Sequence, residues 1–202
     1  MSLSVLPALL VLVTMGVGWW IGDYNGVYAK LAQAAAENPD AQSDEQILAD
    51  LETLDEPQSR FKMHFQLGLA SSLAVVLINS LSVTYLIGTS RWVKEVCDAY
   101  GLDNKYVAKS TKLKRSTFPW SIMGVLAILA IVAFGAAADP GTLRPTTANW
   151  VTPHMIVAMI GSCVILIAIL LQATNLHENS QVIAEVVEDV RKERQLRGLP
   201  VD

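Results

Sequence analysis

The stretch HFQLGLASSLAVVLINSLSVTYLIG, residues 64–88, contains no Asp, Glu, Lys or Arg. Three further stretches share this property, namely residues 3–22, 119–138 and 153–174. Each is long enough to cross the hydrocarbon core of a bilayer as a helix, which takes about 20 apolar residues. A soluble bundle of such helices would carry charges along its outward faces. The sequence therefore predicts an all-α integral membrane protein with four transmembrane helices in a single domain, residues 1–202.

The Lys and Arg residues outside these spans predict the orientation. Eleven of the fifteen lie in residues 89–118 and 175–202, whereas residues 23–63 contain three basic and nine acidic residues. Basic residues that flank a span tend to stay in the cytoplasm. Both termini are therefore predicted to be cytoplasmic, with 89–118 and 175–202 as cytoplasmic helical extensions and 23–63 as an outer loop. The predicted location is the bacterial inner (cytoplasmic) membrane.

The outer loop has helical signals of its own. Ser43-Asp44-Glu45-Gln46 has the form of a capping box. Apolar residues follow at helical spacing: Ile47, Leu48, Leu51 and Leu54. Because Pro39 and Pro57 bracket the segment, we expect a short amphipathic helix at the outer surface. A second helix is expected over Val27–Glu37.

The run Lys112-Leu113-Lys114-Arg115 directly precedes the third span. Such a run is typical of a topology signal. It is also compatible with binding of anionic lipid headgroups. The sequence favours the first interpretation and leaves the second open.

The second and fourth spans resemble each other when the chain is shifted by 90 residues. The shift superposes His64 on His154, Ser72 on Ser162, Thr84 on Thr174, Leu86 on Leu176, Ser90 on Ser180, Glu95 on Glu185 and Val96 on Val186. The first and third spans fit the same scheme, with the outer loop as an insertion. Each half would then be a helix leaving the cytoplasm and a helix returning. We therefore expect a four-helix bundle built from two parallel two-helix repeats, with a symmetry axis along the membrane normal.

The repeat places His64 and His154 at the same depth, near the outer edge of the bilayer. Helix bundles commonly build cofactor sites from side chains on facing helices. Two imidazole nitrogens on opposite faces would suit the iron of a b-type haem, so both histidines are candidate axial ligands. Six small residues share the histidine face and could leave room for the macrocycle: Gly68, Ser71, Ser72, Ala158, Gly161 and Ser162. Arg60, one turn before His64, could bind a haem propionate.

Other interpretations of the same residues stay open. Small residues at this spacing also allow transmembrane helices to pack closely. A structural zinc site would need four ligands, and only two histidines converge. Asn79 and Gln172, inside spans, usually bond to neighbouring helices and could instead line a quinone pocket. The spans contain no Asp, Glu, Lys or Arg, which argues against a proton pump or an ion-coupled transporter.

The plan of four spans with histidines on two helices resembles the membrane-anchor cytochromes b of respiratory complexes, in architecture and without a shared motif. The resemblance implies electron transfer within a larger membrane complex, here with one haem because only one histidine pair is matched. The alternative is a cofactor-free accessory subunit of a multi-subunit membrane complex. In either case the expected partners are the lipid bilayer and other membrane subunits, with no nucleic acid. The chain has no set of catalytic residues, so we do not expect it to catalyse a reaction on its own.

Overall fold

A computed structural model describes residues 2–22, 24–28, 44–142 and 146–200 of the chain. Four long helices account for most of these residues: α1 (Ser2–Trp20), α3 (Asp44–Tyr100), α4 (Lys105–Ala137) and α5 (Val151–Leu196). Two short 3-10 helices, Pro140–Thr142 and Thr147–Trp150, lie between α4 and α5. The described residues contain no β-strand, in agreement with the predicted all-α class.

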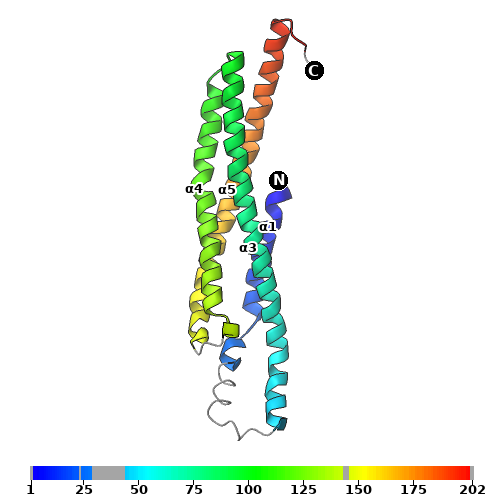
Figure 1. Cartoon of the computed structure of the whole chain (residues 1–202), viewed down its shortest axis with the longest axis vertical. Helices are drawn as coiled ribbons and strands as arrows, with labels where there is room; N and C mark the ends of the chain where they lie inside the picture. The colour runs from blue at the N-terminus through cyan, green and yellow to red at the C-terminus, as the bar shows by residue number, and fades with distance from the viewer. Residues whose placement is uncertain (1, 23, 29–43, 143–145, 201–202) are drawn as a thin grey trace.

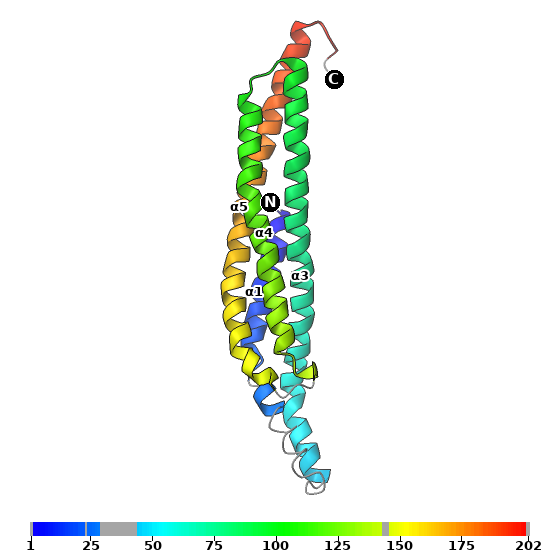
Figure 2. The ribbon, with the colours of Figure 1, turned by 60° about the vertical axis from the view of Figure 1, so that its left-hand side comes forward.

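The long helices run side by side in an elongated bundle (Figure 1). The hairpin between α3 and α4 lies at one end, which we call the hairpin end, together with the C-terminal end of α5 (Figures 1 and 2). The connection between α4 and α5 lies toward the other end, which we call the histidine end. Helix α1 accompanies the other three over part of their length only.

The shortness of α1 divides the bundle into two parts. The four-helix half comprises α1 and residues 60–86, 117–137 and 151–176. The three-helix half comprises residues 89–116 and 177–196. Each half has its own apolar cluster of buried residues. The first cluster contains Val11, Val75, Ile128, Ile165 and Ile169. The second contains Val93, Cys97, Tyr106, Val182 and Val186.

Three helices are long and apolar enough to cross a membrane: Asp55–Tyr100, Lys105–Ala137 and Thr147–Leu196. Helix α1 is also apolar but shorter. The side chains agree with a lipid environment, because Leu69, Leu73 and Leu77 are 57–66% exposed, and no soluble protein would leave so many large apolar side chains in water. Amide side chains of the same helices, by contrast, face inward: Asn79 is 1% exposed. These features identify a membrane protein.

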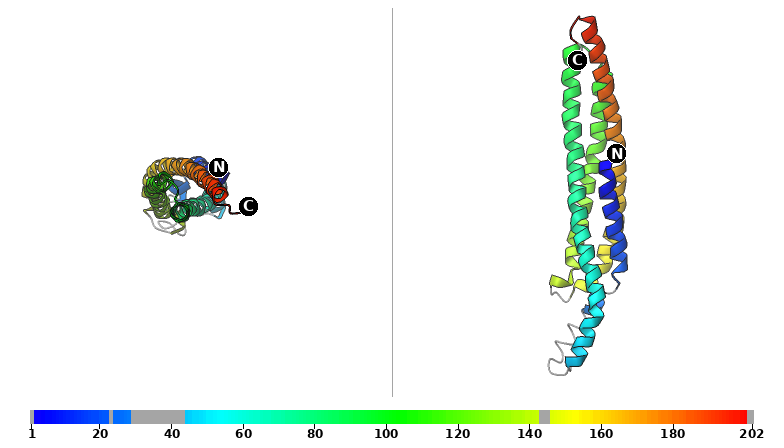
Figure 3. Two further views of the ribbon diagram at one scale, coloured as in Figure 1. Left: turned by 90° about the horizontal axis from the view of Figure 1, so that it is seen from above. Right: turned by 90° about the vertical axis from the view of Figure 1, so that its right-hand side faces the viewer.

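The outer loop differs from its prediction. Residues 44–54 do not form a separate short helix, because they are the first turns of α3, which continues through Pro57. Proline lacks an N–H group and its ring crowds the preceding turn, so it bends a helix when it does not end it. The first part of α3 indeed leans away from the bundle (Figure 3). Most of the expected helix over Val27–Glu37 lies outside the described residues.

Candidate functional site: the histidine pair

The structure brings together the two histidines that the sequence singles out. His64 of α3 and His154 of α5 lie at the histidine end with their ring centroids 6.3 Å apart. The planes of the two rings are inclined at 74° to each other. Both side chains are half-buried between the helices. The two rings are therefore close enough to share a ligand placed between them.

Helix α1 fixes the orientation of His64. Its ring nitrogen Nδ1 is 3.0 Å from the backbone oxygen of Thr14. A carbonyl oxygen only accepts, so this geometry requires Nδ1 to carry the proton and leaves Nε2 with a free lone pair. The ring also fills the space beside Gly18, where an added Cβ would lie 2.7 Å from Cε1 of the imidazole. Only glycine fits at this position without displacing the ring.

Helix α4 holds His154 in a corresponding way. The ring lies beside Gly135, where an added Cβ would be 3.1 Å from Cε1 of His154. A backbone carbonyl that faces this ring is that of Ile131, which lies four residues before Gly135, just as Thr14 lies four residues before Gly18. The contact does not reach hydrogen-bond geometry, so Nδ1 of His154 is buried without a partner. Each histidine thus sits in a glycine notch beneath a backbone carbonyl of the neighbouring helix.

Segment 24–28 contacts α3 and the end of α4 beside the histidine pair. The ring of Tyr24 stacks on Phe61, three residues before His64, with centroids 5.2 Å apart. The side-chain amide of Asn25 donates to the carbonyl of Ala138, three residues after Gly135. Burial is the main cause that raises the pKa of the Tyr24 hydroxyl. The segment thereby packs against both α3 and the end of α4 at the histidine end.

Three of the six small residues predicted to flank a haem, Gly68, Ser71 and Gly161, contact the neighbouring helices. The Ser71 hydroxyl is 2.7 Å from that of Thr14 in α1, and an added Cβ at Gly68 would also meet Thr14. Gly161 lies against Ile131 of α4, where a Cβ would be 2.8 Å from Cδ1. The remaining three are Ser162, which is buried, and Ser72 and Ala158, which are partly buried. In this structure the small residues serve close packing of α1 on α3 and of α4 on α5.

Arg60, the candidate propionate ligand, already has two partners. Its guanidinium forms an ion pair of 2.7 Å with Glu56 and lies 4.4 Å from the centre of the Trp20 ring. The i,i+4 spacing of Glu56 and Arg60 makes the ion pair foreseeable. The cation–π contact depends on how α1 meets α3, which the sequence does not reveal.

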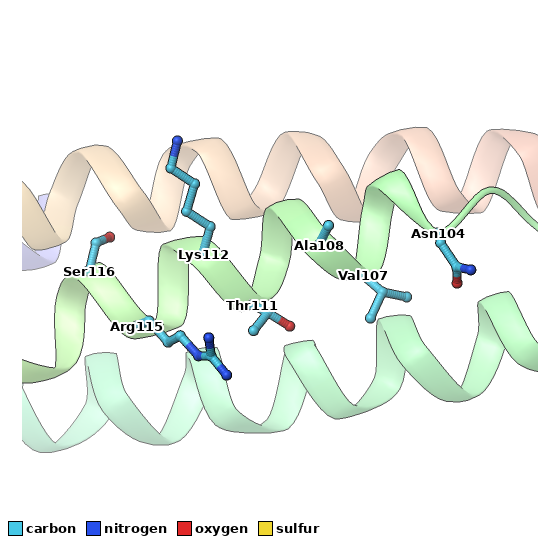
Figure 4. A pocket seen from close by; sticks show the side chains of 7 residues that line it. All are labelled: Asn104, Val107, Ala108, Thr111, Lys112, Arg115 and Ser116. Carbon is cyan, nitrogen blue, oxygen red and sulfur yellow. The ribbon is translucent and has the colours of Figure 1, made fainter.

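A third group of polar residues lies deeper in the four-helix half. The Gln172 amide donates to Asn79 Oδ1 at 2.7 Å, which confirms the prediction that these amides bond between helices. Where side chains are described, no group of three or more His, Cys, Asp or Glu residues could hold a metal ion. A shallow hollow lined by α4 alone, with Lys112 and Arg115 extending to different sides, is far from the histidines (Figure 4).

The residues that position the two rings, Thr14, Gly18 and Gly135, were not among the site residues predicted from the sequence. A weak signal was present, because a glycine near the outer end of the first and third spans lies at the same depth as each histidine. No protein-family model matches the chain, and neither a curated protein sequence nor a solved structure matches it. The case for a function therefore depends on the geometry of the chain itself.

Proposed function

We propose that this protein is a membrane subunit that binds one b-type haem through His64 and His154 and passes electrons within a larger membrane complex. The observation that carries the proposal is the separation of 6.3 Å between the two ring centroids. Two nitrogen–metal bonds of about 2.0 Å, with roughly 1 Å from each nitrogen to its ring centre, would give a separation of about 6 Å. The bound haem would supply one-electron exchange.

The hydrogen bond of His64 supports its role as a ligand. Metal-binding histidines usually donate their second ring N–H to a carbonyl or carboxylate, which fixes the tautomer and the ring orientation. The Thr14 carbonyl fills that role for His64. The Ile131 carbonyl would do so for His154 after a small movement of α4 against α5, which would also give the orphaned Nδ1 a partner.

The architecture that goes with this proposal has four spans. Helix α1 has 19 residues, or about 28 Å at 1.5 Å per residue, close to the hydrocarbon thickness of about 30 Å. The matched notches of Gly18 with His64 and of Gly135 with His154 support two parallel repeats, α1–α3 and α4–α5. Both termini would be cytoplasmic and the histidine end would face outward, in a bacterial inner membrane, as the distribution of Lys and Arg indicates.

Haem binding would require movement within the bundle. Thr14 and Ile131 contact the small residues beside the histidines, so α1 and α4 would have to separate from α3 and α5 to admit the macrocycle. Arg60 could then exchange its exposed partner Glu56 for a propionate, because the Glu56 side chain is 82% exposed. Tyr24 and its neighbours would keep water from the outer edge of the site.

A second function is favoured by the small residues themselves. Gly68 and Ser71 contact α1 and Gly161 contacts α4, without any cofactor between the helices. In that case the chain would be a cofactor-free accessory subunit. Its three-helix half, with a charged surface, would dock the other subunits of the complex.

An absorption difference spectrum distinguishes the two functions. We expect the full chain, purified in mild detergent from cells supplied with haem precursor, to show a reduced-minus-oxidised b-type spectrum. His64→Ala and His154→Ala should each abolish it. His177→Ala, which changes an exposed histidine of α5, is the matched control and should leave it intact. A folded protein without a haem spectrum would refute the haem proposal and favour the accessory subunit.

A further inference from the structure

A groove of about 290 Å³ opens between α1, α3 and α5 where the four-helix half ends. Its lining is mostly apolar, with a few polar groups: Ser4, Ile78, Ser82, Tyr85, Ile169, Gln172, Ala173, Leu176, His177 and Ser180. Small-molecule sites have this character, apolar walls with a small number of placed polar groups, and volumes from about 300 Å³ upward. The groove is therefore large enough for the head of an amphipathic molecule.

The polar group that defines the chemistry of the groove is the amide of Gln172, which is 2% exposed. Its orientation is fixed by a chain of hydrogen bonds. The Val75 carbonyl can only accept, so the group that Asn79 presents to it at 2.7 Å must be the nitrogen Nδ2. Asn79 Oδ1 then faces Gln172 and must receive a proton from Nε2. Gln172 Oε1 is left as a buried acceptor without a partner.

Helix α4 does not supply the missing donor. Gly124 lies against the Asn79 amide, and an added Cβ there would be 3.1 Å from Oδ1, so α4 presents no side chain at that point. The nearby Ser121 hydroxyl is also buried without a hydrogen-bond partner, so it does not reach Gln172. An unsatisfied buried acceptor costs roughly 1–3 kcal/mol. A donor that enters through the groove would remove this cost.

We propose that the groove binds the hydroxyl-bearing head of an amphipathic membrane molecule, with Gln172 Oε1 accepting the hydroxyl hydrogen bond. The apolar part of the ligand would lie against Ile78, Ile169 and Leu176. Two sources share this chemistry: a quinol and a lipid with a free hydroxyl in its headgroup. Molecules that carry only acceptors, such as a quinone, lack the donor that Gln172 requires.

This site is separate from the histidine pair. Ser82 follows His64 by 18 residues along α3, which corresponds to about 27 Å of helix. The groove therefore does not touch the proposed haem, and its occupancy can be tested whether or not haem binds.

The test is equilibrium binding to the detergent-purified full chain under argon, with pairs of similar probes of which only one carries a hydroxyl donor. A decyl-substituted benzoquinol should bind about tenfold more tightly than the matching benzoquinone, the value of one hydrogen bond. For the lipid source, monoolein should bind about tenfold more tightly than its di-O-methyl ether. Discrimination in either pair supports the proposal and identifies the source. Equal binding within both pairs overturns it.

Two variants and one control locate the binding. Gln172→Met removes the acceptor at similar volume and should abolish the discrimination. Ala173→Phe fills the groove without touching the amide pair, so it tests the site even if the Gln172 variant misfolds, and should weaken probe binding at least tenfold. Ser121→Ala, which removes another orphaned polar group at a residue that does not line the groove, should bind like the unchanged chain. Unaltered binding by Ala173→Phe would overturn the proposal.

Discussion

Helix α3 exposes Leu69, Leu73 and Leu77 in the four-helix half, whereas within two turns beyond its apolar stretch it exposes Arg91 and Glu95. The outward face of a single helix thus changes from apolar to charged along its length. The interior changes far less, since both halves bury an apolar cluster. The solvent around the bundle therefore determines the surface of each half, while close packing determines its centre.

The buried polar groups differ in a more instructive way. In the four-helix half, Asn79 and Gln172 form one interhelical bond and leave one acceptor unpartnered. In the three-helix half, Asn179 is fully buried, donates to Thr89 and accepts from Ser110, and Ser110 is also bonded to Ser90. The polar centre of the three-helix half is thus satisfied by protein alone, whereas that of the four-helix half is incomplete.

The largest expected effect comes from a buried charge in the three-helix half. Val182 is fully buried in the second cluster. Val182→Asp should destabilise that half by about 3–5 kcal/mol, because the carboxylate would have no partner. Hydrogen exchange should show lost protection in residues 89–116 and 177–196, with the histidine end still protected. Val187→Asp, at a 46% exposed site five residues on, should change little. Equal loss of protection in both halves would contradict the division of the bundle.

Glycine is needed for different reasons in the two halves. Gly18→Ala should destabilise the chain by about 1–3 kcal/mol through overpacking against His64. His64→Ala should rescue it by vacating the notch. Gly101→Ala, in the hairpin, should cost about 1–2 kcal/mol because its φ of 69° is left-handed, and His64→Ala should not rescue it. Thermal unfolding in detergent measures both effects. Gly16→Ala, with open space around it, is the control, and a loss there equal to that of Gly18→Ala would refute the notch.

Double-mutant cycles compare the two polar centres directly. The Asn79–Gln172 pair should show a coupling energy of about 0.6 kcal/mol, the average for interhelical bonds in membranes. The Ser110–Asn179 pair should show about 1 kcal/mol. Alanine variants and reversible unfolding in mixed micelles give both values. A larger coupling in the four-helix half would mean that its amides are better satisfied than the structure shows.

A further expected effect is a pH dependence confined to the three-helix half. Tyr106 lies 13 residues before the uncharged part of α4, and its hydroxyl donates to Asp189 at 2.6 Å. This bond is the main cause that raises the pKa of Tyr106 to about 12. Its stabilisation is fully present below pH 10, the ordinary pKa of tyrosine, and is lost as the pH rises through about 12. Unfolding measured from pH 9 to 12 should show this loss, and Tyr106→Phe should remove it.

The sequence was sufficient for the large features of the fold. Stretches without charge locate the apolar parts of α1, α3, α4 and α5. A helix without a polar face is stable in contact with lipid and not in contact with water. The uninterrupted course of α3 through Pro57 was not predictable. The cost of one proline is local, and a long helix can absorb it by bending.

The candidate site was predictable in part. The spacing of His64 and His154 within similar spans predicted that their rings would converge, as they do. The notch residues were not predictable, because the side of α1 that meets α3 depends on the rotation of each helix about its axis. For the same reason the sequence could not decide whether Gly161 faces a cofactor or, as found, Ile131 of α4.

The chain order of the three-helix half has a consequence for synthesis. Its first two helical segments come from the α3–α4 hairpin and its third from the end of α5. The ribosome therefore exposes the hairpin, with Val93 and Cys97 uncovered, before the residues that cover them exist. Tyr106 and Val186 are about 80 residues apart, which at 5–20 residues per second is a delay of roughly 4–16 s. During that interval the unfinished hairpin is the part of the nascent protein most open to chaperones and proteases.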